Sequence, residues 1–353
     1  MTKILKGTAI LFLIIIAYVL YIFYSTGFFR KVENSSIGTI EKKVELPGVE
    51  DMQISYEDNF ILLSSDDRAG RRDGNTENGH LYYIDLSNTM FRPIQLTSEL
   101  EIPFYPHGIS MIRIAEKRYK VYAINHVDGN HSIEVFDLQA DRLAHIRTLE
   151  HNSMISPNDI VAIDKERFYF TNDHGFTEGL GKLGEEYLGW AVSNVVYFDG
   201  NDYREVADGI AYANGINLDL NRSLLFVASP RDFLVKVYHI KVDGDLDFIE
   251  NVACGTGVDN IEFTPEGKML IGCHPNLLAF TAYAKGNKPI SPSEIISIDY
   301  RNEGDYSKEI VFLDDGAQMS ASTVAVAYKD LIFMGNVMDN HFLILKKEQL
   351  DQN

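Results

Sequence analysis

The sequence predicts an all-β fold, a six-bladed β-propeller, preceded by one N-terminal transmembrane helix. Three observations lead to this fold class: an uncharged apolar stretch near the N-terminus, short apolar runs rich in Val, Ile, Tyr and Phe after about residue 44, and a polar-then-hairpin unit that occurs six times. The chain has 353 residues, 45% hydrophobic and 24% charged, which is ample for a folded core and too apolar for a disordered protein.

The apolar stretch covers residues 7–29 without a charged side chain, roughly the length that a helix needs to cross a bilayer. Lys3 and Lys6 precede it, and Arg30 and Lys31 follow it. A cleaved signal peptide has a shorter apolar region and a small-residue cleavage site, and neither is obvious here. A buried core helix would need a polar face, and nothing polar interrupts the stretch.

We therefore predict an uncleaved membrane anchor over residues 1–31 and a propeller domain over residues 32–353. Basic residues flank both ends of the stretch, so orientation follows chiefly from the signal-anchor pattern. That pattern favours a single-pass membrane protein whose large domain lies on the extracytoplasmic side.

The charge balance limits the partners of that domain. The chain has 32 Lys and Arg residues against 51 Asp and Glu residues, a formal net charge of -19, which excludes a broad electrostatic grip on nucleic acid. Cys254 and Cys273 are the only cysteines, too few for a disulfide-built scaffold or a structural zinc site. The sequence leaves open whether a single disulfide joins these two cysteines.

Each repeated unit consists of a small polar cluster, an apolar strand, a polar turn and a second apolar strand. Six units about fifty residues apart indicate six propeller blades, whereas a sandwich has no reason to repeat a polar start in this way. If the first strand of each unit is innermost in its blade, the polar starts ring one mouth of a central tunnel. These starts are Asp51, His107, Asn158, Asn214, Asn260 and Ser322.

Most side chains at these starts offer oxygen. Carboxylate and amide oxygens are hard ligands that suit calcium, whereas zinc prefers nitrogen or sulfur. A cation would also offset the repulsion between carboxylates in a confined site. The alternative is that Asn and Asp only cap turns at strand ends. The residues that we predict to form the oxygen ring are Glu50 with Asp51, Asn158 with Asp159, Asn214, and Asp259 with Asn260.

The second hairpin adds a pair of histidines to the ring. With its turn near Glu116 and Lys117, antiparallel pairing sets His107 opposite His126. A lone histidine is more often structural than catalytic, but two adjacent imidazoles beside a metal can form a proton-transfer pair.

The same counting predicts the partners of two carboxylates. It sets Asp159 opposite Asp173, with His174 next to it, and Asp259 opposite Cys273. Each of these pairs would lie at the same end of the tunnel as the oxygen ring.

The connection over residues 175–192 is longer than usual. Large apolar residues recur in it at helical spacing, at Leu180, Leu183, Tyr187 and Leu188. We expect a helix that leaves from the end that carries the oxygen ring. Its role is open between a lid, a hydrophobic wall of the substrate site, a second membrane contact and simple packing on the propeller.

Seven motifs, in order over nearly the whole domain after the anchor, carry a specific resemblance. They are FYPHGIS at 104–110, INHVDG at 124–129, PNDIVAI at 157–163, FYFTNDH at 168–174, YANGIN at 212–217, VDNI at 258–261 and GCHPN at 272–276. Through them the chain resembles the paraoxonases, also called serum arylesterases and lactonases.

The resemblance implies a six-bladed propeller with two calcium ions in its tunnel. It also implies His107 and His126 as a catalytic dyad, acting on small lactones or aryl esters. The implied ligands of the catalytic ion are Glu50, Asn158, Asn214, Asp259 and Asn260. The implied ligands of the structural ion are Asp51, Asp159 and the backbone carbonyl of Ile109.

Two features depart from the resemblance. The family ties its first and last strands with a disulfide, and this chain has no Cys near either end, so strand pairing alone should close the ring. The loop over residues 66–79 also differs from the family's equivalent and lacks its aromatic residue, which bears on substrate preference.

The leading hypothesis is a calcium-dependent hydrolase of lactones and aryl esters. In it, calcium polarises the carbonyl, and His107, assisted by His126, activates the attacking water. One alternative is a membrane-anchored propeller that binds a ligand without chemistry, because fold alone does not fix function. Another is a gluconolactonase-like hydrolase of sugar lactones, which would not need the paired histidines.

Overall fold

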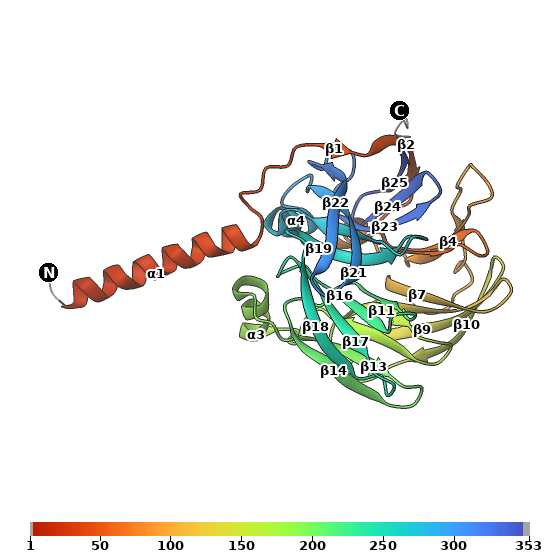
Figure 1. Ribbon diagram of the computed structural model, residues 1–353, viewed down its shortest axis with the longest axis horizontal. Helices are drawn as coiled ribbons and strands as arrows, with labels where there is room; N and C mark the ends of the chain where they lie inside the picture. The colour runs from red at the N-terminus through yellow and green to blue at the C-terminus, as the bar shows by residue number, and fades with distance from the viewer. Residues whose placement is uncertain (1–2, 349–353) are drawn as a thin grey trace.

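The computed structural model describes residues 3–348 and has the predicted architecture, six antiparallel sheets around a central axis (Figure 1). From the axis outward, the first blade has β3 (Val49–Ser55), β4 (Phe60–Ser65), β5 (His80–Asp85) and β6 (Ile94–Gln95). The second has β7 (Pro106–Ala115), β8 (Arg118–Val127), β9 (Asn130–Gln139) and β10 (Arg142–Leu149). The third has β11 (Pro157–Ala162), β12 (Phe168–Asn172), β13 (Ser193–Phe198) and β14 (Tyr203–Ile210).

The remaining three blades continue the ring. The fourth has β15 (Ile216–Asp219), β16 (Leu224–Ser229), β17 (Leu234–Ile240) and β18 (Leu246–Ala253). The fifth has β19 (Gly257–Phe263), β20 (Met269–His274), β21 (Ser293–Asn302), β22 (Asp305–Asp314) and the short β1 (Ser35–Ser36). The sixth has β23 (Ser322–Tyr328), β24 (Leu331–Asn336), β25 (His341–Lys347) and β2 (Gly38–Glu45).

Strand pairing closes the ring, as predicted. Strand β2, from the N-terminal part of the domain, pairs with β25 from Gly38 opposite Lys347 to Glu45 opposite His341. Cys254 and Cys273 are both buried free thiols, so no disulfide joins them. The sixth blade is therefore built from both ends of the domain, and backbone hydrogen bonds hold it together.

Apolar packing between neighbouring blades forms the core. The second strand of a blade is covered on both faces, so it is a continuous rather than an alternating apolar run, and every residue of β16 and β20 is buried. Between the second and third blades, Tyr122, Phe168, Phe170 and Phe198 belong to one cluster. Full burial of such a side chain stabilises the fold by roughly 1.5–3 kcal/mol.

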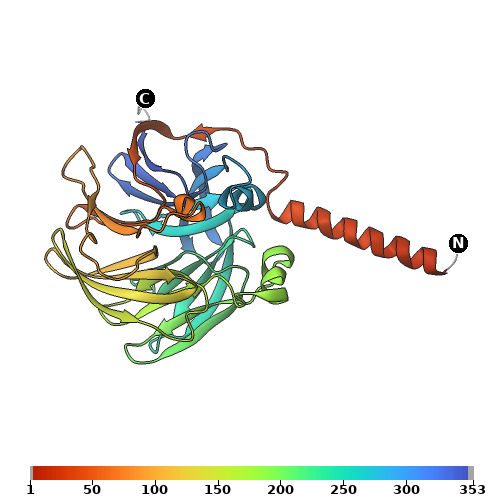
Figure 2. The ribbon, with the colours of Figure 1, turned by 180° about the vertical axis from the view of Figure 1, so that it is seen from behind.

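The N-terminal helix α1 (Lys3–Ser25) projects away from the propeller (Figure 2). Its segment Lys6–Ser25 has a mean hydropathy of 2.3 and is unburied, so by length and composition it could cross a membrane. A signal sequence has the same properties. The chain then turns and is fixed to the propeller, because Arg30 forms two hydrogen bonds of 2.7 and 2.6 Å with the buried carboxylate of Glu294.

Three short helical segments lie at the end of the propeller where the inner strands begin. They are α2 (Arg68–Arg72), α3 (Gly179–Leu183) with the π-helical turn η1 (Gly184–Leu188), and α4 (Leu277–Ala284). Each connects the second and third strands of a blade, and α3 and α4 lie on the side from which α1 leaves (Figure 1 and Figure 2). The prediction of a helix in residues 175–192 is confirmed, and the Tyr18 hydroxyl of α1 donates to the Tyr187 carbonyl at 2.7 Å.

Candidate active site

Bulges near the start of the inner strands bring consecutive polar residues into the interior. In β3, β11 and β19 the antiparallel register shifts within the first few residues. A bulge interrupts the alternation of side chains and turns one of them to a new direction, and bulges are frequent beside active sites. The buried pairs at these three bulges are Glu50 with Asp51, Asn158 with Asp159, and Asp259 with Asn260.

Five side-chain oxygen atoms at these bulges and just before β15 are buried without a hydrogen-bond partner in the described chain. A buried acceptor in this state costs about 1–3 kcal/mol, so such atoms call for an explanation. They come from four different blades, and they are carboxylate or amide oxygens, which suit a hard cation. The atoms are Glu50 Oε2, Asn158 Oδ1, Asn214 Oδ1, Asp259 Oδ1 and Asn260 Oδ1.

These five side chains are the ones that the resemblance implied as ligands of one ion, so the donor set fits a calcium site. Among residues 3–348, no group of three or more His, Cys, Asp and Glu side chains is arranged to hold a metal. The candidate set is of another kind, because three of its five oxygens belong to Asn amides.

The two carboxylates among the five candidate ligands, Glu50 and Asp259, each contact a neighbouring polar side chain. Glu50 Oε1 accepts a hydrogen bond from Asn260 Nδ2 at 3.0 Å and lies 3.4 Å from His107 Nε2. Burial opposes ionisation of Glu50. His107 in its protonated form, the charge of Arg68 and the hydrogen bond from Asn260 overcome this effect and lower the pKa of Glu50. Asp259 Oδ2 lies 2.7 Å from His274 Nε2, and burial raises the pKa of Asp259 despite this contact.

The predicted pairing of Asp259 with Cys273 is wrong. Val258 lies opposite Cys273, and the bulge before Ile261 directs Asp259 to His274 instead. Sequence reasoning missed His274, although it lies in the GCHPN motif, because nothing in the sequence signals the bulge.

A second pair of carboxylates lies among backbone N–H groups. Asp51 accepts hydrogen bonds from the N–H groups of Met52 at 2.8 Å and Ile109 at 2.7 Å. Asp159 accepts in the same way from Ile160 and Ile216, both at 2.7 Å. Burial and nearby carboxylates raise the pKa of both groups well above the usual range. A cation would relieve this repulsion, so Asp51 and Asp159 also fit a calcium site.

The backbone of β7 also passes close to Asp159 at Gly108. A Cβ atom there would lie 2.6 Å from Asp159 Oδ1 and 2.6 Å from the Asn158 carbonyl oxygen. The glycine of the HGI sequence therefore lets β7 pass directly beside the carboxylate.

The predicted contact between the two histidines is present. His107 Nδ1 lies 3.0 Å from His126 Nε2. The two residues do not lie opposite each other in the ladder as predicted, because Pro106 lies opposite Asn125 and a bulge follows before Ile109. Burial and the neighbouring imidazoles His107 and His131 lower the pKa of His126 well below its usual range. His126 is therefore neutral at pH 7 and can accept or donate a hydrogen bond at either nitrogen.

The predicted pairing of Asp159 with Asp173 is also wrong. The Asp159 N–H donates to Thr171 Oγ1, because the bulge in β11 shifts the register. Asp173 instead accepts from Asn158 Nδ2 at 3.3 Å and lies 2.7 Å from His174 Nδ1. Burial opposes ionisation of Asp173, but the hydrogen bond and charge of His174 lower the pKa of Asp173 to about 2.

The loop over residues 66–79 forms one side of the mouth through α2. Arg68 donates to the carbonyl of Pro106 at 2.9 Å, and Arg71 forms an ion pair with Asp66 and lies 3.5 Å over the ring of Tyr105. This loop thus places cationic side chains beside the strand that carries His107.

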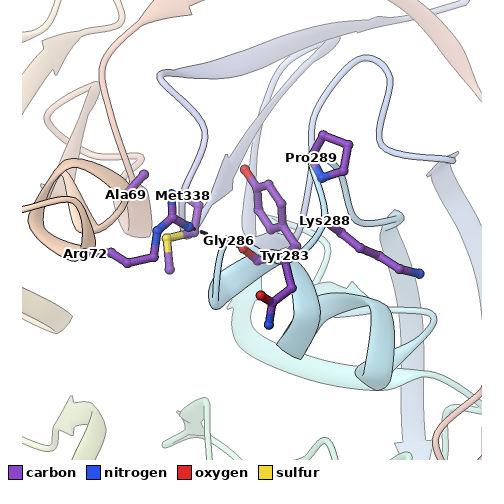
Figure 3. A pocket seen from close by; sticks show the side chains of 8 residues that line it. Ala69, Arg72, Tyr283, Gly286, Lys288, Pro289 and Met338 are labelled. Carbon is purple, nitrogen blue, oxygen red and sulfur yellow. Dashed lines mark hydrogen bonds between the residues drawn. The ribbon is translucent and has the colours of Figure 1, made fainter.

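A cavity of about 420 Å³ lies between α2 and α4 at the same rim. Figure 3 shows Arg72 of α2 and Tyr283 of α4 among the side chains that line it. The Arg72 guanidinium donates to the Tyr283 carbonyl at 3.4 Å, and the Tyr283 hydroxyl donates to Asp339. None of the candidate ligands or paired histidines lines this cavity, so it is separate from the candidate active site.

The fold and the site define a class of protein, a six-bladed β-propeller whose buried oxygens and histidines meet where the inner strands begin. A family model described as Arylesterase matches residues 38–344, which is nearly the whole propeller. The chain therefore belongs to the arylesterase family, and the resemblance to the paraoxonases is confirmed.

Curated relatives agree with this assignment. Serum paraoxonase/arylesterase 1 of Rattus norvegicus is 34% identical over 237 residues, which cover 66% of this chain and 66% of the relative. Serum paraoxonase/arylesterase 2 of Bos taurus is 31% identical over 265 residues, which cover 73% of this chain and 74% of the relative. The match to the rat protein thus spans 66% of that protein's length.

Solved structures of lower identity share the fold. A luciferin-regenerating enzyme superposes with a TM-score of 0.57 at 10% identity, covering 87% of this chain and 93% of that one. Regucalcin from Agrobacterium tumefaciens gives 0.51 at 9% identity, covering 89% and 97%. At such identities, the likeness concerns the propeller alone.

Proposed function

We propose that this protein is a calcium-dependent hydrolase of lactones and aryl esters. The single observation that carries the proposal is the set of five buried, unpartnered oxygens with His107 Nε2 directed at one of its carboxylates. The substrate class rests on the family, whose relatives have names that include arylesterase, paraoxonase and lactonase.

Two groups of residues would hold calcium. One ion would be held by Glu50, Asn158, Asn214, Asp259 and Asn260, and a second by Asp51, Asp159 and the carbonyl of Ile109. When bound, calcium supplies positive charge that polarises the substrate carbonyl and stabilises the oxyanion that develops on it.

His107 is the residue that would activate water. When its Nδ1–H donates to His126 Nε2, its own Nε2 carries a free lone pair and can take a proton from the attacking water. His126 maintains this tautomer because it is neutral and accepts at Nε2. The protonated Nε2 of His107 can then return a proton to the leaving oxygen. Paired histidines favour this reaction over the gluconolactonase-like alternative, which would not need them.

Substitution of His107 tests the proposal. His107→Gln should lower kcat on lactones by roughly 10²-fold or more, which is typical for loss of a general base. Calcium affinity should barely change in this variant, whereas Asp259→Asn should reduce both calcium affinity and kcat. Steady-state kinetics and calcium titration of both variants, with the exposed-histidine variant His239→Gln as control, separate the two roles. Near-full lactonase activity in His107→Gln would contradict the assigned base.

We also propose that α1 anchors the enzyme to a membrane with the propeller on the extracytoplasmic side. The helix is apolar and unburied, and its end is fixed to the face that carries the candidate site. Mass spectrometry of the mature protein from membrane fractions tests this, because a cleaved signal sequence would leave a shorter chain without α1.

A further inference from the structure

The paired histidines are the inner part of a row of three. His126 and His131 lie directly opposite each other in the β8–β9 ladder. His126 Nδ1 lies 2.7 Å from His131 Nδ1, while His126 Nε2 lies 3.0 Å from His107 Nδ1. The central imidazole therefore uses both of its nitrogens on its two neighbours.

The row leads from the oxygen ring to the surface. At its inner end, His107 Nε2 lies 3.4 Å from Glu50 Oε1. At its outer end, the half-buried His131 directly follows the exposed turn over residues 128–130, and its Nε2 has no hydrogen-bond partner within residues 3–348. This nitrogen is free to exchange a proton with water.

We propose that His131 is the outer end of a three-imidazole proton relay that connects the water-activating nitrogen of His107 to solvent. The proposal rests on the proposed hydrolase function, because that function makes His107 the group that takes up a proton. His131 acts through His126 and does not touch the substrate.

The proton movements balance along the row. As His107 Nε2 takes a proton from water, its Nδ1 proton passes to His126 Nε2, and the His126 Nδ1 proton passes to His131 Nδ1. His131 then releases its Nε2 proton to solvent, so each ring gains one proton and loses one. The reverse shift supplies a proton through His107 Nε2 to the leaving alkoxide. The carboxylic acid product ionises, so each turnover releases one proton in total.

The surroundings of His126 and His131 favour the neutral forms of both imidazoles. Burial lowers the pKa of His131, and the carboxylate of Asp173 partly opposes this. The charge of Arg68 acts on His126 in the same direction as burial. A row of neutral imidazoles traps no proton, whereas a charged member would block the relay.

Two variants separate a relay from a residue that only positions His126. His131→Gln keeps a side chain that can hydrogen-bond to His126 but cannot pass a proton, and His131→Ala removes both properties. His239→Ala, on the exposed face of β17, serves as the control.

Kinetics at several buffer concentrations provide the first readout. In dilute buffer, both His131 variants should lose about tenfold in kcat, less than the loss of roughly 10²-fold or more expected for the base itself, with KM unchanged. Concentrated buffer or added imidazole should restore kcat, because small bases replace the missing proton path. Wild-type kcat in His131→Gln at every buffer concentration would overturn the relay and leave only a positioning role.

Nitrogen-15 NMR of the histidine rings provides a readout that needs no substrate. In a relay, His131→Ala shifts the tautomer of His126 and the pH at which its ring titrates, whereas His239→Ala does not. An unchanged His126 tautomer overturns the relay. If the wild type hydrolyses neither lactones nor aryl esters, the proposed function fails, and the NMR comparison still decides whether the three rings are coupled.

Discussion

A calcium chelator should lower the unfolding temperature of this protein substantially. The propeller interior contains five buried side-chain oxygens of the proposed ligands that have no hydrogen-bond partner within the described chain. It also contains Asp51 and Asp159, whose pKa values are raised by burial and by nearby carboxylates. Removal of the proposed ions would leave both groups of residues without compensation.

The structure sets the size of this effect. At about 1–3 kcal/mol for each unpartnered acceptor, five acceptors cost at least about 5 kcal/mol of folding stability. Water molecules that enter the emptied site and donate hydrogen bonds to these oxygens reduce that cost. Mass action gives a similar figure, since a ligand present at about 1,000 times its Kd stabilises the folded state by about 4 kcal/mol. At roughly 2–4 °C per kcal/mol, the expected shift is on the order of 10 °C.

Thermal unfolding followed by circular dichroism, in calcium and in chelator, measures the shift. In calcium, Asp51→Asn and Asp159→Asn should unfold at lower temperature than Asn214→Ala. In chelator, both Asp variants should match or exceed the wild type, because each removes one repelling charge. Asp137→Asn, which removes an outer carboxylate paired with Arg118, should keep the full calcium effect. Equal wild-type curves in calcium and chelator would refute a structural ion.

Three further predictions concern other parts of the molecule. Gly108→Ala should lower the unfolding temperature and the calcium affinity, because its Cβ would lie 2.6 Å from Asp159 Oδ1; wild-type calorimetry of this variant would contradict the close approach. Arg30→Met should cost about 3–5 kcal/mol in denaturant unfolding, because Glu294 is 1% exposed and would lose its ion pair. Hydrogen bonds from a tyrosine and an arginine lower the pKa of Asp58, so Asp58→Asn should destabilise the protein at pH 7 and have no effect well below about pH 4 in pH-dependent melting.

The strands could be predicted because buried strands require apolar residues, which are visible in the sequence. Second strands such as β16 and β20 are buried throughout and are therefore apolar except at their last residues, Ser229 and His274. The polar starts of the inner strands interrupt that pattern, so residues such as Asn158 and Asn260 could be identified one blade at a time. Because these polar residues recur at the start of each inner strand, they were predicted to lie together at one end of the propeller.

The partners of the carboxylates could not be predicted, because they depend on bulges. One extra residue in β19 moves Asp259 from Cys273 to His274, and the bulge in β11 similarly moves Asp159 to Thr171. A bulge has no compositional signal in these strands, so counting from the turn fails beyond it.

Two other contacts were missed for different reasons. The contact of His131 with His126 could have been found by the same counting, because an Asp-Gly turn directly separates their strands. The ion pair of Arg30 with Glu294 joins residues 264 positions apart, and no local pattern indicates it.

The most direct test of the proposed function uses the purified full chain. Its hydrolysis of aliphatic lactones and aryl esters is measured in calcium, in chelator and after calcium is restored. We expect turnover in calcium, its loss in chelator and its return with added calcium. We also expect kcat to fall by roughly 10²-fold or more in His107→Gln under all conditions that support activity. Absence of turnover on every lactone and ester, or turnover that chelator and His107→Gln both leave unchanged, would contradict the proposed function.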